Sequence, residues 1–279
     1  MNSWLEAAIL GLIQGLTEFL PISSSAHLRI AGALLPSGED PGAAFTAISQ
    51  IGTEAAVIIY FWKDIWHISM SWLHSLTGIG GDAARDENAA RMGWLVIIGT
   101  LPIAILGLLF QDAIETSLRN LYITATMLIG FGIVLGLADR FGARVKTLDR
   151  LSWRDGILYG FAQAMALIPG VSRSGGTISA GRAMGYTREA AARYSFLLAI
   201  PAVLASGFYK LFDSWGEFGR LGVGETALAT LVAFVVGYAV IVMFLRYIST
   251  RSFNIFVIYR VAAGLGLLAL LWTGVVPAQ

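Results

Sequence analysis

Hydrophobic residues are grouped along the chain in long blocks that are separated by short polar stretches. Six blocks approach the roughly 20 apolar residues with which a helix crosses a bilayer: residues 43–62, 92–111, 118–138, 191–211, 226–245 and 253–272. An isolated strand cannot satisfy its backbone polar groups in lipid, so all six blocks are expected to be helices. The pattern predicts an all-α polytopic membrane protein with one integral membrane domain over residues 1–279.

Two further apolar blocks, at residues 4–20 and 156–168, are shorter. Each ends at a proline, Pro21 or Pro169, and a serine-rich turn, after which a second short helical segment begins. Short and interrupted hydrophobic segments are typical of re-entrant hairpins that bury a polar tip inside the protein. The alternative is that both segments are kinked helices that cross the membrane.

The two interrupted segments are related to each other in sequence. A shift of 149 positions places Ser3, Trp4, Gly11, Gln14, Ser23, Ser25, Ala31 and Gly32 on Ser152, Trp153, Gly160, Gln163, Ser172, Ser174, Ala180 and Gly181. The match predicts two repeats, at about residues 1–142 and 150–279, each with one hairpin and three crossings. Three is an odd number, so the second repeat is expected to be inverted, with the two polar tips meeting near the midplane.

The charged residues then define an orientation for this topology. One face carries thirteen basic residues: Lys63, Arg85, Arg91, Arg140, Arg144, Lys146, Arg150, Arg154, Arg182, Arg188, Arg193, Arg246 and Arg251. The other face carries four: Arg29, Arg119, Lys210 and Arg220. The positive-inside rule makes the first face cytoplasmic. Both termini and the mouth of the first hairpin are therefore expected to face outward.

Composition excludes several classes of function. The chain is 56% hydrophobic and 13% charged, far from the charged content of a soluble domain. It has no cysteine, which excludes disulfides, thiol catalysis and thiolate metal sites. No basic run suggests a partner nucleic acid. Its 32 glycines permit close helix contacts, either within the core or in a homodimer.

The first polar tip combines an acid with an anion site. Gln14 and Glu18 lie one helical turn apart and share a face. The helix that restarts after Pro21 is capped by Ser23 or Ser24, and His27 falls in its first turn. Free N–H groups at a helix start attract anions, and the hydroxyls, including that of Ser25, add donors.

The second tip, "PGVSRSGGTIS", supplies Ser172, Ser174 and Thr177 together with Arg173. A guanidinium at membrane depth needs a partner, and a phosphate gripped by two parallel hydrogen bonds fits it. At the shifted positions Glu18 is replaced by Leu167 and His27 by Gly176, so only the first tip carries acid–base groups. This asymmetry favours phosphoryl transfer, which demands positioning and charge stabilisation.

Other interpretations of these residues stay open. Glu18 and Arg173 could form a structural ion pair. The broken helices also fit a transporter or flippase of a phosphorylated lipid or small anion, with transport alone or combined with hydrolysis. A non-catalytic membrane subunit is disfavoured because it leaves the buried polar groups without a purpose. Among the remaining polar groups, Glu54 is either a supporting or metal-coordinating group or, as we favour, a protonated, hydrogen-bonded packing residue. Arg260 is expected to form a structural pair or to extend toward the interface.

The histidines outside the tips, His67 and His74, are expected in a solvated loop after the first crossing. The mixed-charge segment "GDAARDENAAR" is expected to be a cytoplasmic loop and is assigned no function.

The motifs "QGLTEFLPISSSAH" and "PGVSRSGGT" resemble the two signatures of the bacterial undecaprenyl-diphosphate phosphatases of the BacA/UppP family. The resemblance covers nearly the whole chain, with both motifs in the family's order and spacing. It implies an enzyme of the bacterial inner membrane with interlocked inverted repeats and re-entrant helices. It also implies hydrolysis of the terminal phosphate of undecaprenyl diphosphate, which regenerates the lipid carrier for peptidoglycan and other envelope polymers, and a role in bacitracin resistance. The family's activity depends on a divalent cation, Mg²⁺ or Ca²⁺.

The family's functional positions fall on residues of both motifs. The implied catalytic residues are Glu18, Ser24, His27 and Arg173, and the implied substrate-binding residues are Gln14, Ser23, Ser25, Ser172, Ser174 and Thr177. Glu18 is also the expected metal ligand, since the family has glutamate or glutamine at the first position and the glutamine found here, Gln14, cannot act as a base. Glu54 stands where the family pattern has a neutral residue.

Two versions of the reaction follow from this assignment. In one, Ser24 attacks the terminal phosphorus and His27 serves as base or as acid for the leaving group. In the other, water attacks directly with Glu18 or His27 as base, and Ser24 only donates a hydrogen bond.

Overall fold

Helices make up almost all of the ordered secondary structure of the protein. The computed structural model describes residues 2–78, 86–215 and 219–278. Within those ranges there is no strand, and the only β-type pairing is an isolated bridge between Lys146 and Tyr186. The prediction of an all-α protein is confirmed.

Six helices have the length and apolar composition that a membrane crossing requires. They are α3 (Gly42–Tyr60), α5 (Glu87–Leu109), α7 (Leu121–Phe141), α10 (Arg188–Asp213), α11 (Val223–Thr250) and α12 (Asn254–Trp272). Each overlaps one of the six predicted blocks, so the six predicted helices are present, with the length and composition of membrane spans. Several helices start before their apolar block because a polar cap precedes it. The Asp86 side chain, for example, accepts hydrogen bonds from the backbone N–H groups of Asn88 and Ala89 at the start of α5.

A helix follows the first crossing where a loop was expected. After a short break at Phe61 the chain continues as α4 (Trp62–Thr77), which packs against α5. His67 and His74 lie on this helix, so their assignment to a loop was wrong. His67 is nevertheless exposed, with Nε2 at 2.9 Å from the Asp86 carboxylate. Residues 79–85, with Arg85 and the first part of the mixed-charge segment, lie outside the described residues.

Two pairs of short helices are built alike. The first pair is α1 (Ser3–Thr17) and α2 (Ser24–Leu34), and the second is α8 (Trp153–Ala164) and α9 (Arg173–Ala183). Helices α2 and α9 both have 11 residues and begin 149 positions apart. The residue before each, Ser23 or Ser172, has a positive φ, of 74° and 70° respectively. The predicted break after each first segment and the restart as a second helix are both present.

Remaining short helices connect these elements. They are α6 (Gln111–Glu115) and the 3-10 turns η2 (Ser117–Arg119), η3 (Leu148–Arg150) and η4 (Met165–Leu167).

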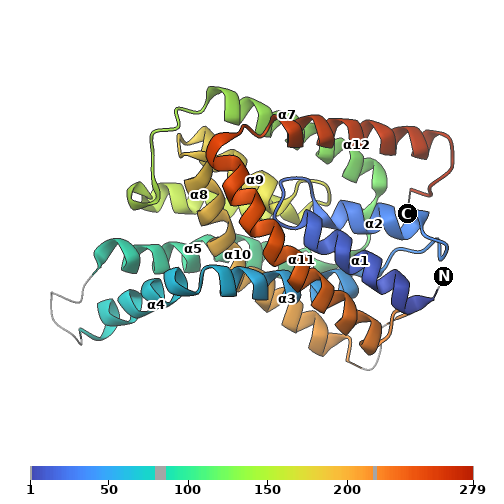
Figure 1. The fold of residues 1–279 in the computed structure, drawn as a ribbon, viewed down its shortest axis with the longest axis horizontal. Helices are drawn as coiled ribbons and strands as arrows, with labels where there is room; N and C mark the ends of the chain where they lie inside the picture. The colour runs from blue at the N-terminus through green and yellow to red at the C-terminus, as the bar shows by residue number, and fades with distance from the viewer. Residues whose placement is uncertain (1, 79–85, 216–218, 279) are drawn as a thin grey trace.

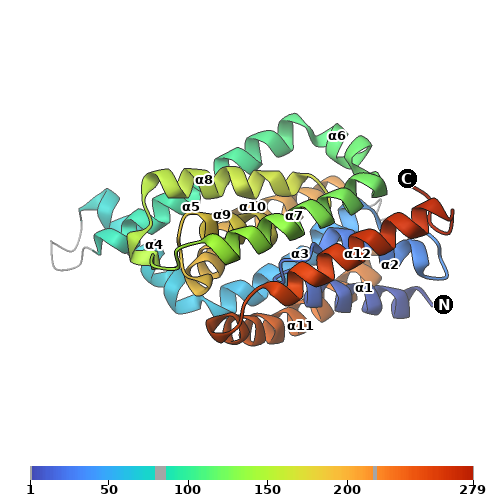
Figure 2. The same ribbon diagram turned by 90° about the horizontal axis from the view of Figure 1, so that it is seen from above.

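Each hairpin packs against a long helix from the other half of the chain. Helix α1 lies along α11, and α8 lies along α5, while α3 pairs with α10 and α7 with α12 (Figure 1; Figure 2). Gly11 and Gly160, which the shift of 149 superimposes, make the two hairpin contacts close. A Cβ on Gly11 would lie 2.4 Å from the carbonyl oxygen of Ala229, and one on Gly160 would lie 2.7 Å from that of Gly99.

The ends of the chain lie together at one end of the bundle, as both views show (Figure 1; Figure 2). The end of α4, the start of α5 and the connection between α7 and α8 lie toward the opposite end. Arg182, near the end of α9, is fully buried there and donates from Nε to the Asp139 carboxylate at 2.9 Å.

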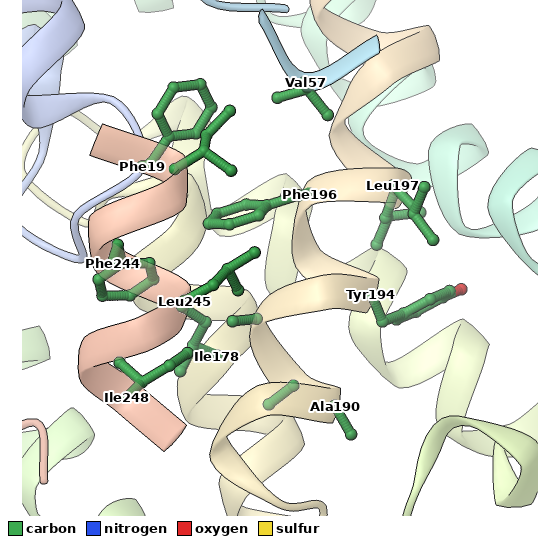
Figure 3. Packing of buried hydrophobic residues seen from close by; sticks show 14 of the residues in the cluster. Phe19, Val57, Ile178, Ala190, Tyr194, Phe196, Leu197, Phe244, Leu245 and Ile248 are labelled. Carbon is green, nitrogen blue, oxygen red and sulfur yellow. The ribbon is translucent and has the colours of Figure 1, made fainter. Parts of the chain in front are cut away.

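A hydrophobic core holds the first hairpin in place immediately beside Glu18. Phe19 is buried and meets Phe196 of α10 edge-on, with ring centroids 5.4 Å apart. Ile178 of α9 and Phe244 of α11 complete this part of the core (Figure 3). Segments from both halves of the chain are therefore packed around the turn that follows α1.

Candidate active site

Glu18 lies at the centre of a buried hydrogen-bond network that joins the two motifs. Its Oε2 accepts from Gln14 Nε2 at 2.7 Å and from Ser24 Oγ at 2.5 Å. Its Oε1 accepts from Arg173 Nη2 at 2.6 Å. A carboxylate, a hydroxyl and a guanidinium from positions 155 residues apart are thereby brought into direct contact.

Local backbone geometry places Ser24 against Glu18. Helix α1 ends at Thr17, and the chain turns through Pro21 before α2 begins at Ser24. The left-handed conformation of Ser23 reverses the chain so that the first residue of α2 folds back toward the end of α1. Ser23 occupies the N-cap position, but its side chain does not cap the helix and its Oγ lies 3.3 Å from Ser25 Oγ.

The serines of the second tip have different tasks. Ser172 Oγ caps α9 by accepting from the N–H of Gly175 at 3.1 Å. Ser174 Oγ donates to the carbonyl oxygen of Leu20 at 3.0 Å, a direct bond between the two tips. Ser172 thus organises the start of α9, and Ser174 attaches it to the first hairpin.

Thr177 is fully buried and faces the protein interior. Its Oγ1 lies 2.7 Å from the carbonyl oxygen of Arg173 and 2.5 Å from Ser195 Oγ. The side chain therefore supports the first turn of α9, and it does not line the cavity described below.

Glu54 of α3 is a member of the cluster that the sequence did not place there. It is fully buried, and its Oε1 lies 3.1 Å from Arg173 Nη1, while neither carboxylate oxygen has a hydrogen bond. The structure gives Glu54 a guanidinium neighbour in place of the hydrogen bond that the sequence interpretation favoured, and the protonation of Glu54 stays a prediction. Its position inside a crossing helix was the one available signal. Arg173 consequently lies between two carboxylates.

His27 points away from Ser24. Its Nδ1 lies 2.7 Å from the carbonyl oxygen of Ser23, and its Nε2 lies 2.6 Å from Tyr259 Oη of α12. A carbonyl only accepts, so Nδ1 carries the hydrogen, and in the neutral ring Nε2 accepts from the tyrosine. The rings are stacked, with centroids 5.5 Å apart. Nothing in the sequence marked Tyr259, which is one aromatic residue among many in the crossing helices.

A cavity of about 520 Å³ opens beside this network. Its polar end is formed by Glu18, Ser23, Ser24, Ser25, Ser172 and Arg173. Its walls are mainly apolar and come chiefly from α3, α5 and α10, with Ala47, Leu108 and Val203 among them. Polar groups at one end of an apolar cavity suit an amphiphilic ligand with a charged head.

Comparison with known proteins identifies a family that this chain matches. The family model described as "Bacitracin resistance protein BacA" matches residues 7–266.

The chain belongs to the BacA family.

Curated relatives within the BacA family match at full length. "Undecaprenyl-diphosphatase 2" of Agrobacterium fabrum is 68% identical over 99% of this chain and 98% of its own. "Undecaprenyl-diphosphatase" of Paenarthrobacter aurescens is 63% identical, over 99% of this chain and all of its own. The protein of that name from Micrococcus luteus is 62% identical over the same shares. The BacA match includes both hairpins, so the cluster around Glu18 lies inside the region that defines the family.

Proposed function

We propose that the protein is an undecaprenyl-diphosphate phosphatase. It hydrolyses the terminal phosphate of undecaprenyl diphosphate to undecaprenyl phosphate and so recycles the lipid carrier for peptidoglycan and other envelope polymers. The observation that carries this conclusion is the Ser24–Glu18–Arg173 cluster at the polar end of an apolar cavity, in a membrane protein whose full-length relatives bear that enzyme's name.

The cavity accommodates the two parts of such a substrate separately. The diphosphate lies at the polar end, where Arg173, the serine hydroxyls and the start of α2 and α9 supply donors and positive potential. The polyprenyl chain follows the apolar wall between α5 and α10 toward the lipid. Sequestering the head group from bulk water strengthens every charge interaction at that end.

Arg173 changes one of its partners when the phosphate binds. Its Nη2 turns from Glu18 to a phosphate oxygen, while Nη1 stays on Glu54. Glu54 therefore anchors the guanidinium during the exchange. The carboxylate of Glu18 loses a cationic partner at that moment and becomes a better proton acceptor.

Ser24 is the nucleophile in this account, and Glu18 takes its proton. The short Oγ to Oε2 contact already presents the hydrogen to the carboxylate. The bond between Ser24 Oγ and the terminal phosphorus forms as the bond to the bridging oxygen breaks, and undecaprenyl phosphate leaves. Glu18 passes its proton to the departing undecaprenyl phosphate. Water then attacks the phosphorus of the phosphoserine while Glu18 accepts the proton of the water. The bond between that phosphorus and Ser24 Oγ breaks, Glu18 returns the proton to Oγ, and inorganic phosphate departs. In the competing version water attacks the substrate directly and Ser24 only donates a hydrogen bond.

His27 has a structural role in this account, because it links the first tip to α12. Both of its ring nitrogens are engaged, with the Ser23 carbonyl and Tyr259. The base that contacts Ser24 is accordingly Glu18, and His27 fixes the turn that carries Ser23 and Ser24.

A divalent cation, Mg²⁺ or Ca²⁺, completes the proposal. The described residues contain no group of three His, Asp or Glu side chains that would hold an ion alone. The oxygens of Glu54 and the Oε1 of Gln14 are buried without hydrogen bonds. Glu18 is bonded to Gln14 and shares Arg173 with Glu54. Such a donor set fits an ion that takes most of its ligands from phosphate and water, with Glu18 as the principal protein ligand. The bound cation would neutralise charge on the phosphate oxygens.

The membrane arrangement is part of the same proposal. Repeats at about residues 1–142 and 150–279 are inverted, and both hairpins are re-entrant. The support is the reciprocal packing of α1 on α11 and of α8 on α5, together with the equal α2 and α9. The protein lies in the bacterial inner membrane with both termini and the first hairpin mouth outward.

Phosphate release by detergent-purified protein tests the function. With undecaprenyl diphosphate and added Mg²⁺, the wild type is expected to turn over and Arg173→Ala to be nearly inactive. Detergent removes the two compartments that a transporter needs, so turnover under these conditions identifies an enzyme. A wild type that releases no phosphate with any divalent cation would overturn the proposal in favour of transport.

A further inference from the structure

Arg260 is a fully buried arginine in the middle of the crossing helix α12. A guanidinium at this depth is costly unless its donors are satisfied. Among the described residues no carboxylate forms an ion pair with it, which differs from the ion pair or extension to the interface expected from the sequence. The side chain instead has five hydrogen bonds, all to backbone carbonyl oxygens.

The five carbonyls belong to three separate segments. Nη1 donates to Pro21 at 2.9 Å. Nη2 donates to Gly170 at 2.7 Å, to Val171 at 3.0 Å and to Met127 at 3.2 Å, and Nε donates to Leu128 at 3.1 Å. One side chain thus binds the tip of the first hairpin, the tip of the second hairpin and the middle of α7.

The two tip carbonyls occupy equivalent places in the repeats. Pro21 and Gly170 are 149 positions apart, the same shift that aligns the two hairpins. Two residues after each one comes the serine with positive φ, and the next residue, Ser24 or Arg173, starts a helix. The guanidinium therefore binds both hairpin tips three residues before Ser24 and Arg173, the two residues that contact Glu18.

Neighbouring glycines leave room for this side chain. A Cβ on Gly175, in the first turn of α9, would lie 2.7 Å from Arg260 Nη1. A Cβ on Gly132 of α7 would lie 3.1 Å from the Cβ of Arg260. The surrounding helices are shaped to accept the guanidinium at this position.

We propose that Arg260 is a positioning residue, which fixes the two hairpin tips relative to each other so that Ser24 and Arg173 meet on Glu18. It touches neither the cavity nor a reacting atom, and it acts through the backbone of Pro21 and Gly170. Lysine cannot replace it, because an ammonium has three donors on one atom whereas the guanidinium fork reaches carbonyls on several sides. The inference rests on the proposed phosphatase activity for one of its two readouts.

The first test compares Arg260→Lys and Gly175→Ala with matched controls. Gly175→Ala keeps Arg260 but pushes a methyl group against Nη1, and alanine is the better helix former. Its control is Gly266→Ala, at a position on α12 with no atom within 4 Å of the new Cβ. The control for Arg260→Lys is Arg182→Lys, which alters another fully buried guanidinium that binds Asp139.

Because misplacement of reacting groups by about 1 Å lowers rates by about 10²-fold, both test variants are expected to lose kcat on that scale. Their KM for the polyprenyl diphosphate should stay within about threefold, while both controls keep kcat in the folded fraction. Equal kcat in Gly175→Ala and Gly266→Ala, both folded, would overturn the proposal. So would a loss of kcat in Arg182→Lys as large as that in Arg260→Lys at equal thermal stability.

A second readout needs no activity. The chain has no cysteine, so a single Ser25→Cys at the first tip reports local opening by its rate of reaction with a water-soluble maleimide. Adding Gly175→Ala should raise this rate several-fold, and adding Gly266→Ala should leave it unchanged. Equal rates would overturn the positioning role even if the wild type were inactive, whereas a faster rate in an inactive protein would retain that role and reject the phosphatase.

Discussion

Ser24 donates its hydroxyl hydrogen to Glu18 across 2.5 Å, although Glu18 follows the last residue of α1 and Ser24 is the first residue of α2. The bond joins two residues that are six positions apart. Arg173 of the second hairpin donates to the same carboxylate. A hydroxyl, a carboxylate and a guanidinium are thereby assembled from two segments far apart in sequence.

Ser24→Ala tests whether the serine attacks phosphorus. In the covalent account the substitution removes the nucleophile, and kcat should fall by more than about 10³-fold, beyond the loss of a single hydrogen bond. Acid-quenched wild type exposed to substrate labelled in the terminal phosphate should carry protein-bound label at Ser24. A reduced but clear rate, of about one tenth of wild type, with no trapped label would support direct attack by water.

Glu54→Gln tests the anchor of Arg173. The amide keeps the shape of the side chain but removes the negative charge 3.1 Å from Nη1, so the guanidinium loses one of its two carboxylate partners. We expect kcat to fall about tenfold and thermal stability to drop, as for other buried ion pairs that lose one member. Glu189→Gln, on the exposed side of α10, is the matched control and should behave as wild type. Identical kinetics of the two variants would show that Glu54 does not position Arg173 for activity.

Tyr259→Phe tests whether the hydrogen bond between Tyr259 and His27 orients the first tip. The change removes only the hydroxyl that lies 2.6 Å from Nε2. Loss of one such hydrogen bond is worth about 1 kcal/mol, which corresponds to a decrease in kcat of about fivefold if the bond orients the tip. Tyr122→Phe, at an exposed position of α7, is the control. An unchanged kcat in both variants would show that the His27–Tyr259 contact does not orient the tip.

The Asp40–Arg119 pair predicts a dependence of stability on pH. Burial alone would raise the pKa of Asp40, but hydrogen bonds from Arg119, with Nη2 at 2.6 Å and Nε at 3.2 Å, hold that pKa below its usual value. A carboxyl whose pKa is lowered by folding stabilises the protein above its unfolded pKa of about 3.9. That contribution is lost as the pH falls through the lower folded value.

Asp40→Asn should therefore lower the free energy of unfolding by roughly 1 kcal/mol at pH 7, since the pair is partly exposed. The difference from wild type should shrink below about pH 4. Thermal unfolding in detergent at both pH values measures it, with the exposed Asp112→Asn as control. A difference in stability between wild type and Asp40→Asn that stays constant down to pH 3 would mean that the carboxylate charge does not stabilise the fold.

Much of the fold was predictable because a lipid bilayer permits few backbone structures. Apolar length alone located the six crossings, and the prolines with their serine-rich turns located the interruptions. Helix α4 was missed because its mixture of tryptophan, histidine and charge has no long apolar run, so an amphipathic helix looked like a loop. The continuation of a helix past Phe61 depends on packing against α5, which the local pattern does not contain.

The hydrogen-bond and ion-pair partners of the buried polar groups were harder to predict from the sequence than the residues of the site themselves. The membership of Glu18, Ser24 and Arg173 followed from motif chemistry, and the structure brings all three together. Glu54 and Arg260 were visible as charges in crossing helices, but their partners depend on how the two halves interlock. The direction of His27 was not predictable either, since it depends on Tyr259, which lies 232 residues away.

The most direct test of the central claim is phosphate release from undecaprenyl diphosphate by purified Glu18→Gln beside wild type, with folding checked by thermal unfolding. The substitution keeps a hydrogen-bonding side chain but removes both the proton acceptor for Ser24 and the partner of Arg173. The account predicts a loss of kcat of about 10²- to 10⁴-fold in a folded protein. A folded Glu18→Gln variant within about threefold of wild type would contradict it.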